Sequence, residues 1–453
     1  MFRKILIANR GEIALRILRA CRELGIRSVI AYSEADRTSL PVLLADEAVC
    51  IGPAPSVRSY NSISAVISAA TVTGCDALHP GYGFLAENAS LAEICRDCGI
   101  TFIGPRPEVM QEMSDKATAR RIMHRNGLPI VPGTQEPVHD AQKAAEEAER
   151  IGYPIVIKAV AGGGGRGMRV AEGERELLRM LPLAQAEAQS AFGDRGVYLE
   201  RYLNRPRHIE VQVLGDEHER VVSLGERDCS LQRRYQKLVE ESPAPNITKK
   251  LRDNLAKAAV KGAKAIHYTG AGTVEFLVDD QGRFYFTEMN TRIQVEHPVT
   301  EMVTGVDLVQ WQIRIAAGEK LDFNQKDVEY EGHAIEVRIN AEDAMNNFAP
   351  SGGTIDKLVL PGGPGVRIDT HLYQGYRVPT NYDSLLGKII VWGETRTAAI
   401  ARMQRALAET IVDDIPTTVP FYQLLMRDPE FGEGNVTTSF IPEFMERIGH
   451  SRD

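Results

Sequence analysis

Residues 288–297 read Glu-Met-Asn-Thr-Arg-Ile-Gln-Val-Glu-His, with a polar side chain at every second position from the first glutamate onward. In an extended segment, alternate side chains project to one face. A strand that only completes a core has an apolar face. The repeated face here holds two acids, a base and two amides, namely Glu288, Asn290, Arg292, Gln294 and Glu296. The segment therefore predicts a strand that contributes a binding or catalytic site.

A β-hairpin is expected immediately before this segment. Residues 272–279 and 283–290 read as two strands around an Asp-Asp-Gln-Gly turn. The register of that turn puts Glu275 opposite Phe286 and diagonal to Glu288, with alpha carbons roughly 7–8 Å apart. Two such carboxylates can share a divalent cation, and magnesium suits oxygen ligands beside substrate phosphates. The alternative is an acidic pair on a solvated sheet face.

A glycine-rich segment further upstream indicates phosphate binding. Residues 154–159 form a short apolar strand that includes Lys158, and the sequence continues Ala-Gly-Gly-Gly-Gly-Arg-Gly-Met-Arg from Ala161. Glycine amides can approach phosphate oxygens closely. The run matches G-x-G-x-x-G, but residues 168–171 read as a strand and not as a helix, so the dinucleotide interpretation fails. A Walker loop is excluded because no Lys-Ser or Lys-Thr follows the glycines. We expect a glycine flap between two strands.

These motifs together resemble biotin carboxylase, an ATP-grasp enzyme, from about Phe2 to about Ile448. Besides the glycine flap and residues 288–300, the resemblance rests on Ile-Ala-Asn-Arg-Gly-Glu-Ile-Ala at 7–14, His-Pro-Gly-Tyr-Gly-Phe-Leu at 79–85, Glu-Arg-Asp-Cys-Ser at 226–230 and Arg-Ile-Asn-Ala-Glu-Asp at 338–343.

The resemblance implies a multidomain protein of the α/β and α+β classes. We expect an N-terminal open parallel α/β domain at 1–113, an ATP-grasp domain at 114–330 with a mobile lid at about 131–203, and a β-rich C-terminal domain at 331–447. Apolar strands near residues 4–8 and 28–32 that alternate with helices support the first of these.

The resemblance also implies site residues for the nucleotide and its metal ions. Glu275, Glu288 and Asn290 would bind Mg²⁺ or Mn²⁺. ATP would contact Lys116, Lys158, Gly163, Gly164, Gly165, Met168, Glu200, Arg201, Leu203, His208, Gln232, Tyr235 and Leu277. Lysines and metal ions that neutralise a transferring phosphoryl group suit catalysis by positioning and electrostatics. Tyr235 stands where the family usually has histidine, and Arg201 replaces a common lysine.

For bicarbonate, the resemblance implies Lys237, Arg292, Gln294 and the amide of Val295, with Glu296 as the catalytic base. The two-residue spacing of guanidinium, amide and carboxylate also suits a small planar anion. The alternative for Glu296 is a salt bridge to Arg292.

For biotin, the resemblance implies Arg338 and Tyr82. Arg338 lies on the polar side of the alternating run 333–340, opposite Ile335, Val337 and Ile339. Its guanidinium would stabilise charge on the ureido oxygen, as an oxyanion site does. The alternative pairs Arg338 with Glu336 or Glu342.

The implied function is a ligase reaction: ATP-dependent carboxylation of biotin on a separate biotin carboxyl carrier protein, with bicarbonate, through carboxyphosphate. It would be the first half-reaction of acetyl-CoA carboxylase in fatty acid synthesis, with carboxyltransferase subunits as further partners. Alternatives are a biotin carboxylase subunit for another acyl-CoA, pyruvate or urea, another ATP-grasp ligase that acts on an amine, or a silent nucleotide-binding scaffold.

Composition sets further expectations. The 453 residues carry a net charge of −8, which disfavours an extended nucleic-acid surface. No apolar run approaches the roughly 20 residues of a membrane span. The six scattered cysteines fit reduced thiols in a cytoplasmic protein. Arg16, Arg19 and Arg22 form a stripe on the first helix, and a solvated face is the default interpretation. In the family this helix lies at a homodimer contact, so we expect a homodimer.

Overall fold

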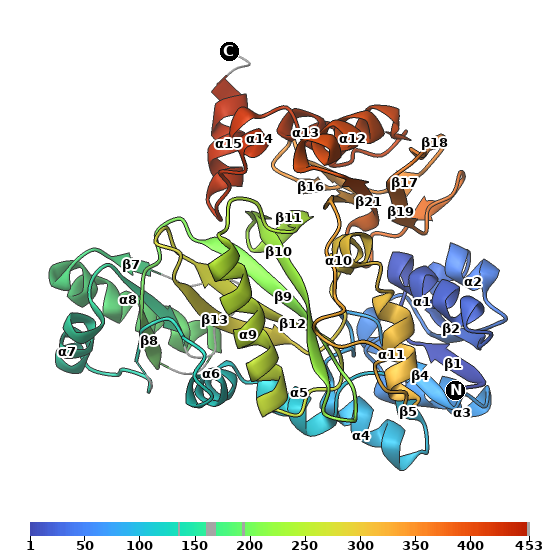
Figure 1. The fold of residues 1–453 in the computed structure, drawn as a ribbon, viewed down its shortest axis with the longest axis horizontal. Coiled ribbons are helices and arrows are strands. Elements are labelled where there is room, and N and C mark those ends of the chain that lie inside the picture. The colour runs from blue at the N-terminus through green and yellow to red at the C-terminus, as the bar shows by residue number, and fades with distance from the viewer. Residues whose placement is uncertain (135, 160–168, 193–194, 451–453) are drawn as a thin grey trace.

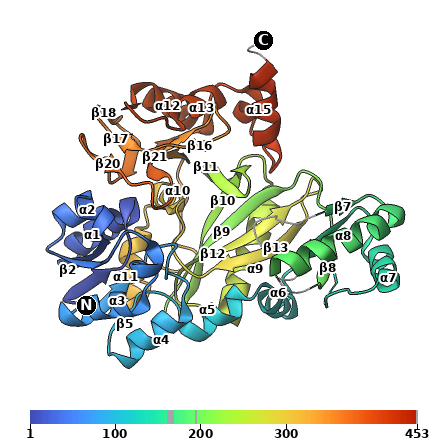
Figure 2. The same ribbon diagram turned by 180° about the vertical axis from the view of Figure 1, so that it is seen from behind.

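The computed structural model describes residues 1–134, 136–159, 169–192 and 195–450. Three regions follow one another along the chain, and a large central sheet connects the second to the third (Figure 1). In the reverse view, the N-terminal region (blue) and residues 141–159 and 169–192 (green) lie at opposite sides of the molecule, with the C-terminal region (red) above the first (Figure 2).

The N-terminal region is an open α/β unit, as expected. Its five strands are parallel in the order β3-β2-β1-β4-β5. Ile5, Leu6 and Ile7 are fully buried because helices cover both faces of such a sheet. The elements are β1 (Lys4–Ile7), α1 (Gly11–Glu23), β2 (Arg27–Ser33), α2 (Leu40–Leu44), β3 (Glu47–Gly52), α3 (Ile63–Val72), β4 (Ala77–His79), α4 (Ala89–Asp97), β5 (Thr101–Phe102) and α5 (Pro107–Ser114).

Helix α1 corrects one expectation about its arginines. Arg19 and Arg22 are exposed, but Arg16 is 8% exposed and lies 2.9 Å from Glu301 and 2.7 Å from Asp307. The predicted solvated stripe is therefore wrong at Arg16. Helix α1 packs between its own sheet and the last two strands of the central sheet, so one side of the stripe is covered.

The middle region begins with a small unit of one sheet and its helices. Three antiparallel strands in the order β7-β6-β8 pack against α7 and α8. The predicted strand that carries Lys158 is present, and a strand, not a helix, resumes at Arg169. The elements are α6 (Lys116–Arg125), α7 (Ala141–Ile151), β6 (Ile155–Ala159), β7 (Arg169–Ala171), α8 (Glu174–Phe192) and β8 (Val197–Arg201).

The central sheet is antiparallel, with eight strands in the order β13-β12-β9-β10-β11-β14-β21-β19. Its elements from the middle region are β9 (Arg207–Gly215), β10 (Val221–Arg233), β11 (Gln236–Ser242), β12 (Gly270–Val278) and β13 (Phe284–Asn290), with α9 (Lys249–Ala265), α10 (His297–Thr304) and α11 (Leu308–Ala316). The boundary expected after residue 330 falls between α11 and β14, but the sheet itself continues from β11 into β14.

The C-terminal region adds the other strands and packs helices on one side of them. Ile335, Val337 and Ile339 of β14 lie in its hydrophobic core, as the alternation predicts. The elements are β14 (His333–Asn340), β15 (Glu342–Asp343), β16 (Ala349–Pro350), β17 (Gly353–Thr354), β18 (Leu358–Val359), β19 (Val366–Thr370), β20 (Arg377–Val378), β21 (Leu385–Gly393), α12 (Arg396–Glu409), β22 (Ile411–Val412), α13 (Val419–Leu425), α14 (Pro429–Glu433) and α15 (Phe440–His450).

Candidate active site

One face of β11, β14 and β21 carries charged side chains although it is buried. Arg338 lies directly opposite Lys388 across β14 and β21, and Glu336 lies opposite Glu240 across β14 and β11. Paired residues, and residues two apart, share a face. These four side chains therefore project to the side away from the hydrophobic core. Buried charges are costly without partners, so the contacts among them define the site.

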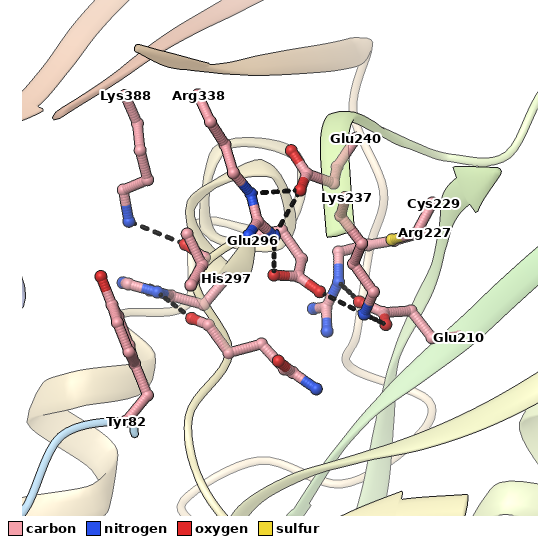
Figure 3. A network of polar contacts seen from close by, with 12 residues as sticks. Tyr82, Glu210, Arg227, Cys229, Lys237, Glu240, Glu296, His297, Arg338 and Lys388 are labelled. Carbon is pink, nitrogen blue, oxygen red and sulfur yellow. Dashed lines mark hydrogen bonds and ion pairs between the residues drawn. The ribbon is translucent and has the colours of Figure 1, made fainter. Parts of the chain in front are cut away.

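Glu296 joins two of the predicted cations. One carboxylate oxygen lies 2.9 Å from Arg338 Nη2, and the other lies 2.6 Å from Lys237 Nζ (Figure 3). Arg338 Nε also donates to Glu240 Oε1 at 2.7 Å. Glu296 itself is fully buried. The alternatives that paired Glu296 with Arg292, or Arg338 with Glu336 or Glu342, are not the pairs formed.

Lys237 sits among three carboxylates. Its ammonium lies 2.5 Å from Glu210 and 3.0 Å from Glu275, besides its contact with Glu296. Burial alone would lower the pKa of Lys237, but the three acids raise it well above its usual value. For Glu296, burial alone would raise the pKa, but Lys237 and Arg338 hold it well below its usual range. Both groups are therefore charged at neutral pH.

The acidic hairpin forms in a register that differs from the predicted one. Val278 pairs with Phe284, so the turn is one residue longer than expected, and a β-bulge between Phe286 and Glu288 adds a second shift. Glu275 consequently lies directly opposite Glu288 and not opposite Phe286. The two carboxylates are thus closer than predicted, with alpha carbons about 5 Å apart.

The run that follows the hairpin is not a strand throughout. β13 ends at Asn290 and α10 begins at His297, with Glu296 as its N-cap at φ −80° and ψ 10°. Pro298 lies in the first turn of α10, where proline favours a helix start. The chain must therefore turn before the helix, and the prediction of one continuous extended face is right only as far as Asn290.

Side-chain contacts nevertheless gather this run at the acidic hairpin. Arg292 donates to Asn290 Oδ1 at 3.1 Å and to Gln294 Oε1 at 3.0 Å. Gln294 Nε2 lies 3.4 Å from Glu275 Oε1. Arg292 is also paired with Glu87 at 2.8 Å, which contributes a carboxylate from the loop after β4. The predicted bicarbonate-binding groups therefore lie beside the predicted metal-binding acids.

Both lysines predicted to bind ATP are paired with carboxylates. Lys116 Nζ lies 3.0 Å from Glu288 Oε2, and Lys158 contacts Glu200. Arg120 contacts the same Glu200 carboxylate. Burial alone would raise the pKa of Glu200, but Lys158 and Arg120 hold it below its ordinary value. These pairs keep both lysines beside anionic oxygens.

His208 and Gln232 lie behind the acidic hairpin. His208 Nε2 is 2.9 Å from Glu275 Oε2, and Gln232 Nε2 is 2.5 Å from His208 Nδ1. Burial alone would lower the pKa of His208, but Glu275 raises it above the ordinary value. The imidazole is therefore held next to the acid that would bind a metal ion.

The other predicted residues are more dispersed. Tyr235 is 60% exposed in the turn between β10 and β11, with φ +66°, and Arg201 donates to the carbonyl of Ile151 at 2.8 Å. Leu203 and Leu277 are half-buried. Tyr82 donates to Glu12. Four predicted ATP contacts lie outside the described residues, namely Gly163, Gly164, Gly165 and Met168.

Gly81 positions the loop that carries Tyr82. Asn9 Nδ2 donates to the carbonyls of Pro80 and Tyr82, at 2.7 Å each. Gly81 has φ +64°, and a Cβ there would lie 2.9 Å from Asn9 Nδ2. The loop therefore needs glycine at this position to lie against the start of α1.

Several charged residues of the site were not predicted. Glu210, Arg227 and Glu240 lie on strands whose buried faces are polar, and they meet the site only through pairing between distant strands. Of these unpredicted residues, Lys388 has the clearest sequence signal, because it is a single lysine in the apolar run of β21. The remaining unpredicted residues, Glu87 and Arg120, carry no local signal that we recognise.

Family models match almost the whole chain in three segments. Residues 1–110 match the biotin carboxylase N-terminal domain, residues 115–324 the ATP binding domain of the carbamoyl-phosphate synthase L chain, and residues 336–443 the biotin carboxylase C-terminal domain. Within the residues that the structure describes, no helix combines the length and apolar character needed to cross a bilayer.

Individual relatives are similar over nine tenths or more of their length. A biotin carboxylase of Nostoc is 57% identical over 442 residues, which cover 98% of this chain and 99% of that protein. A pyruvate carboxylase subunit of Methanothermobacter thermautotrophicus is 54% identical, with 99% and 91% covered. A crystal structure of the biotin carboxylase domain dimer of Hydrogenobacter thermophilus 2-oxoglutarate carboxylase, in complex with MgADP, ADP and bicarbonate, is 48% identical, covers 98% of both chains and superposes with a TM-score of 0.90.

Proposed function

This chain belongs to the biotin carboxylase family of ATP-grasp ligases, and from that premise we propose that it carboxylates biotin on a separate carrier protein with ATP and bicarbonate. The observation that carries the proposal is the contact of Glu296 with both Lys237 and Arg338. A base, a bicarbonate-binding cation and a biotin-binding cation then act within one network.

The nucleotide would lie between Lys116, Lys158 and the acidic hairpin. Glu275, Glu288 and Asn290 offer oxygen ligands on neighbouring strands, and Glu288 is partly open to solvent, which suits a magnesium ion that keeps some of its waters. The ion would neutralise charge on the terminal phosphates. Lys116 and Lys158, now paired with acids, would turn to the phosphate oxygens when ATP binds.

Bicarbonate would bind to Arg292, Gln294, Lys237 and the amide of Val295. Glu296 removes its proton, after which a bicarbonate oxygen attacks the terminal phosphorus of ATP and ADP leaves. A bound anion next to Lys237 partly cancels the positive charge that Lys237 exerts on Glu296. The pKa of Glu296 therefore rises, and Glu296 becomes a stronger base when the proton must be taken. The product is carboxyphosphate.

Biotin would meet Arg338, with Tyr82 beside its ring. Carboxyphosphate breaks down to carbon dioxide and phosphate, and the phosphate takes the proton from the ureido nitrogen. The guanidinium of Arg338 stabilises the negative charge that develops on the ureido oxygen. The nitrogen then bonds to the carbon of carbon dioxide. Water must be kept out of this step, because free carboxyphosphate hydrolyses.

As the finer assignment we propose the first half-reaction of acetyl-CoA carboxylase, in fatty acid synthesis, by a cytoplasmic homodimer. Relatives at similar identity include one component of a pyruvate carboxylase, so another acyl-CoA, pyruvate or urea is the competing final acceptor. The acceptor is chosen on the carboxyltransferase, so assays with each purified carboxyltransferase and its carrier would identify it.

The basic activity is tested by ADP release with magnesium, ATP and bicarbonate, with and without free biotin. We expect turnover that biotin stimulates and that both Glu296→Ala and Arg338→Ala abolish. Bicarbonate-dependent ADP release on which biotin has no effect at any concentration would instead favour an ATP-grasp ligase that acts on an amine. Absence of any bicarbonate-dependent turnover would reject the proposed reaction.

A further inference from the structure

Two consecutive backbone carbonyls beside the site are held by buried side chains. The carbonyl of Gln294 accepts a hydrogen bond from His297 Nδ1 at 2.7 Å, and the carbonyl of Val295 accepts one from Lys388 Nζ at 2.7 Å (Figure 3). His297 and Lys388 are both fully buried. The peptide planes on both sides of the Val295 alpha carbon are therefore fixed by contacts to their oxygens.

The orientation of these carbonyls determines where the amides point. In a planar trans peptide, the N–H lies on the side opposite to the C=O. Because His297 holds the carbonyl of Gln294, the amide of Val295 faces away from His297. Among the residues that the structure describes, this amide has no hydrogen-bond acceptor. The Val295 amide is therefore left to bind a ligand. The next peptide, whose carbonyl Lys388 holds, joins Val295 to Glu296.

Lys388 is itself held by the N-terminal region. Its Nζ lies 3.1 Å from Glu12 Oε1 at the start of α1, and the hydroxyl of Tyr82 donates to the same oxygen. A hydrogen-bonded chain thus runs from Tyr82 through Glu12 and Lys388 to the carbonyl of Val295. It connects the N-terminal loops, β21 and the segment before α10.

We propose that Lys388 is a positioning residue for this reaction, which orients the Val295–Glu296 peptide for bicarbonate and ties that orientation through Glu12 to Tyr82 on the biotin side. The inference rests on the proposed function. Lys388 does not touch the substrates. It fixes the peptide that joins Val295, whose amide is left for bicarbonate, to Glu296.

The charge on Lys388 strengthens this role. Burial alone would lower the pKa of its amine, but Glu12, Glu336 and Asp369 raise it above the ordinary value. A charged donor makes a stronger hydrogen bond to a carbonyl than a neutral donor does. A hydrophobic side chain of the same length could fill the space but could not hold the peptide plane.

The test is the Michaelis constant for bicarbonate in Lys388→Met, measured by ADP release at saturating ATP. We expect it to rise about tenfold or more, because a small displacement of a reacting group costs one to two orders of magnitude. The Michaelis constant for ATP should stay within about twofold, since the lysines that bind its phosphates are not touched. Equal changes in both constants, or no change in either, would overturn the inference.

Lys4→Met is the matched control. Lys4 also bridges a carboxylate and a backbone carbonyl, Glu47 at 2.9 Å and Thr73 at 2.7 Å, but it lies at the start of β1, outside the site. We expect both Michaelis constants to be unchanged in this variant. A bicarbonate constant that rises equally in Lys4→Met would show that the effect is general destabilisation.

Glu12→Gln keeps the inference testable if Lys388→Met does not fold. The amide oxygen can still accept from Tyr82 and Lys388, but the ion pair with the ammonium is lost. The bicarbonate constant should therefore rise about threefold, with the ATP constant unchanged. No rise in a folded Glu12→Gln protein would overturn the inference. Wild-type protein without bicarbonate-dependent ADP release would reject the proposed function instead, which separates the two failures.

Discussion

Glu296 is the residue on which the proposed chemistry most depends. It is fully buried, yet two cations keep it ionised. We expect Glu296→Gln to fold, since the amide can still accept from Lys237, but to lose bicarbonate-dependent ADP release by about a hundredfold or more. Steady-state assays would measure this. Glu47→Gln, at an acid paired with Lys4 and Arg27 in the N-terminal region, should keep full activity. Comparable turnover in Glu296→Gln would exclude it as the base.

His371 makes the stability of the protein sensitive to pH. It is 2% exposed, and burial lowers the pKa of its imidazole to about 3. The unfolded chain takes up this proton near pH 6.5 but the folded protein does not, so stability is lost as pH falls from about 6.5 toward 3.

His371→Phe should remove this contribution while it keeps the edge-to-face contact with Tyr376. Between pH 7.5 and 5.5 the variant should lose about 1.4 kcal/mol less free energy of unfolding than the wild type. Urea titrations at the two pH values measure the difference, and the other titrating groups are common to both proteins. Parallel pH curves would contradict the prediction.

At this scale, the sequence predicted which candidate residues lie close together better than it predicted how they pair. Arg338 was placed on the polar side of its strand because alternation is local. Its partners were not found, because Glu240 comes from β11, about a hundred residues earlier, and reaches Arg338 only when the two strands pair. Lys388 stands out as a lysine in the apolar run of β21, but its role was missed because it depends on a backbone contact that no motif encodes.

At the scale of secondary structure, Arg227 joins four elements around the site. Its fully buried guanidinium donates to Glu210 and Gln212 of β9, Thr273 of β12 and Thr300 of α10. Each of these acceptors would lose this donor if the arginine were removed, and Glu210 would keep its contact with Lys237. The side chain therefore holds β9, β10 and β12 against α10.

Arg227→Met should lower the free energy of unfolding by about 3–5 kcal/mol, because the buried carboxylate of Glu210 loses the guanidinium with which it is paired. Equilibrium urea unfolding would measure this. Arg405→Met is the control, since Arg405 makes an exposed pair with Glu409 within α12, and such pairs contribute little. A loss in Arg227→Met no larger than in the control would show that the guanidinium is not a structural tie.

Local patterns predicted element types well and register poorly. Strand β14 has the bounds that the alternation of 333–340 predicted. The predicted hairpin register was wrong because the turn is one residue longer than expected and a bulge adds a second shift, and neither changes the apolar pattern. The prediction of an extended run is wrong after Asn290 because the chain must turn before α10 begins. Alternation of polar residues alone does not distinguish a strand from a loop whose side chains converge on one site.

On the scale of the whole molecule, the shared sheet predicts that the second region does not fold without the third. A fragment that ends at residue 330 would leave the edge of β11, where Val239 to Ser242 pair with β14, open to solvent. Exposed strand edges promote aggregation. We expect this fragment to aggregate in size-exclusion chromatography, whereas the full chain does not. A monomeric fragment with native near-UV circular dichroism would contradict this expectation.

The three-domain architecture followed from the resemblance, but the sharing of the sheet did not. Motif order along the chain places the regions one after another and says nothing about which strands pair between them. The pairing of β11 with β14 joins segments separated by α9 to α11. The alternation in β14 does not specify the strand with which it pairs, and β11, which reads Gln-Lys-Leu-Val-Glu-Glu-Ser, does not alternate regularly.

The continuous sheet also limits how this gene could recombine with those of its relatives. An exchange at the apparent seam between residues 324 and 336, where the family models meet, would take β14 from one parent and β11 from the other. Glu240 and Arg338 would then come from different parent proteins, although they form a hydrogen bond with each other in the folded chain. Productive crossovers in natural or laboratory chimeras should therefore move residues 236–242 together with the C-terminal third, or leave both in place.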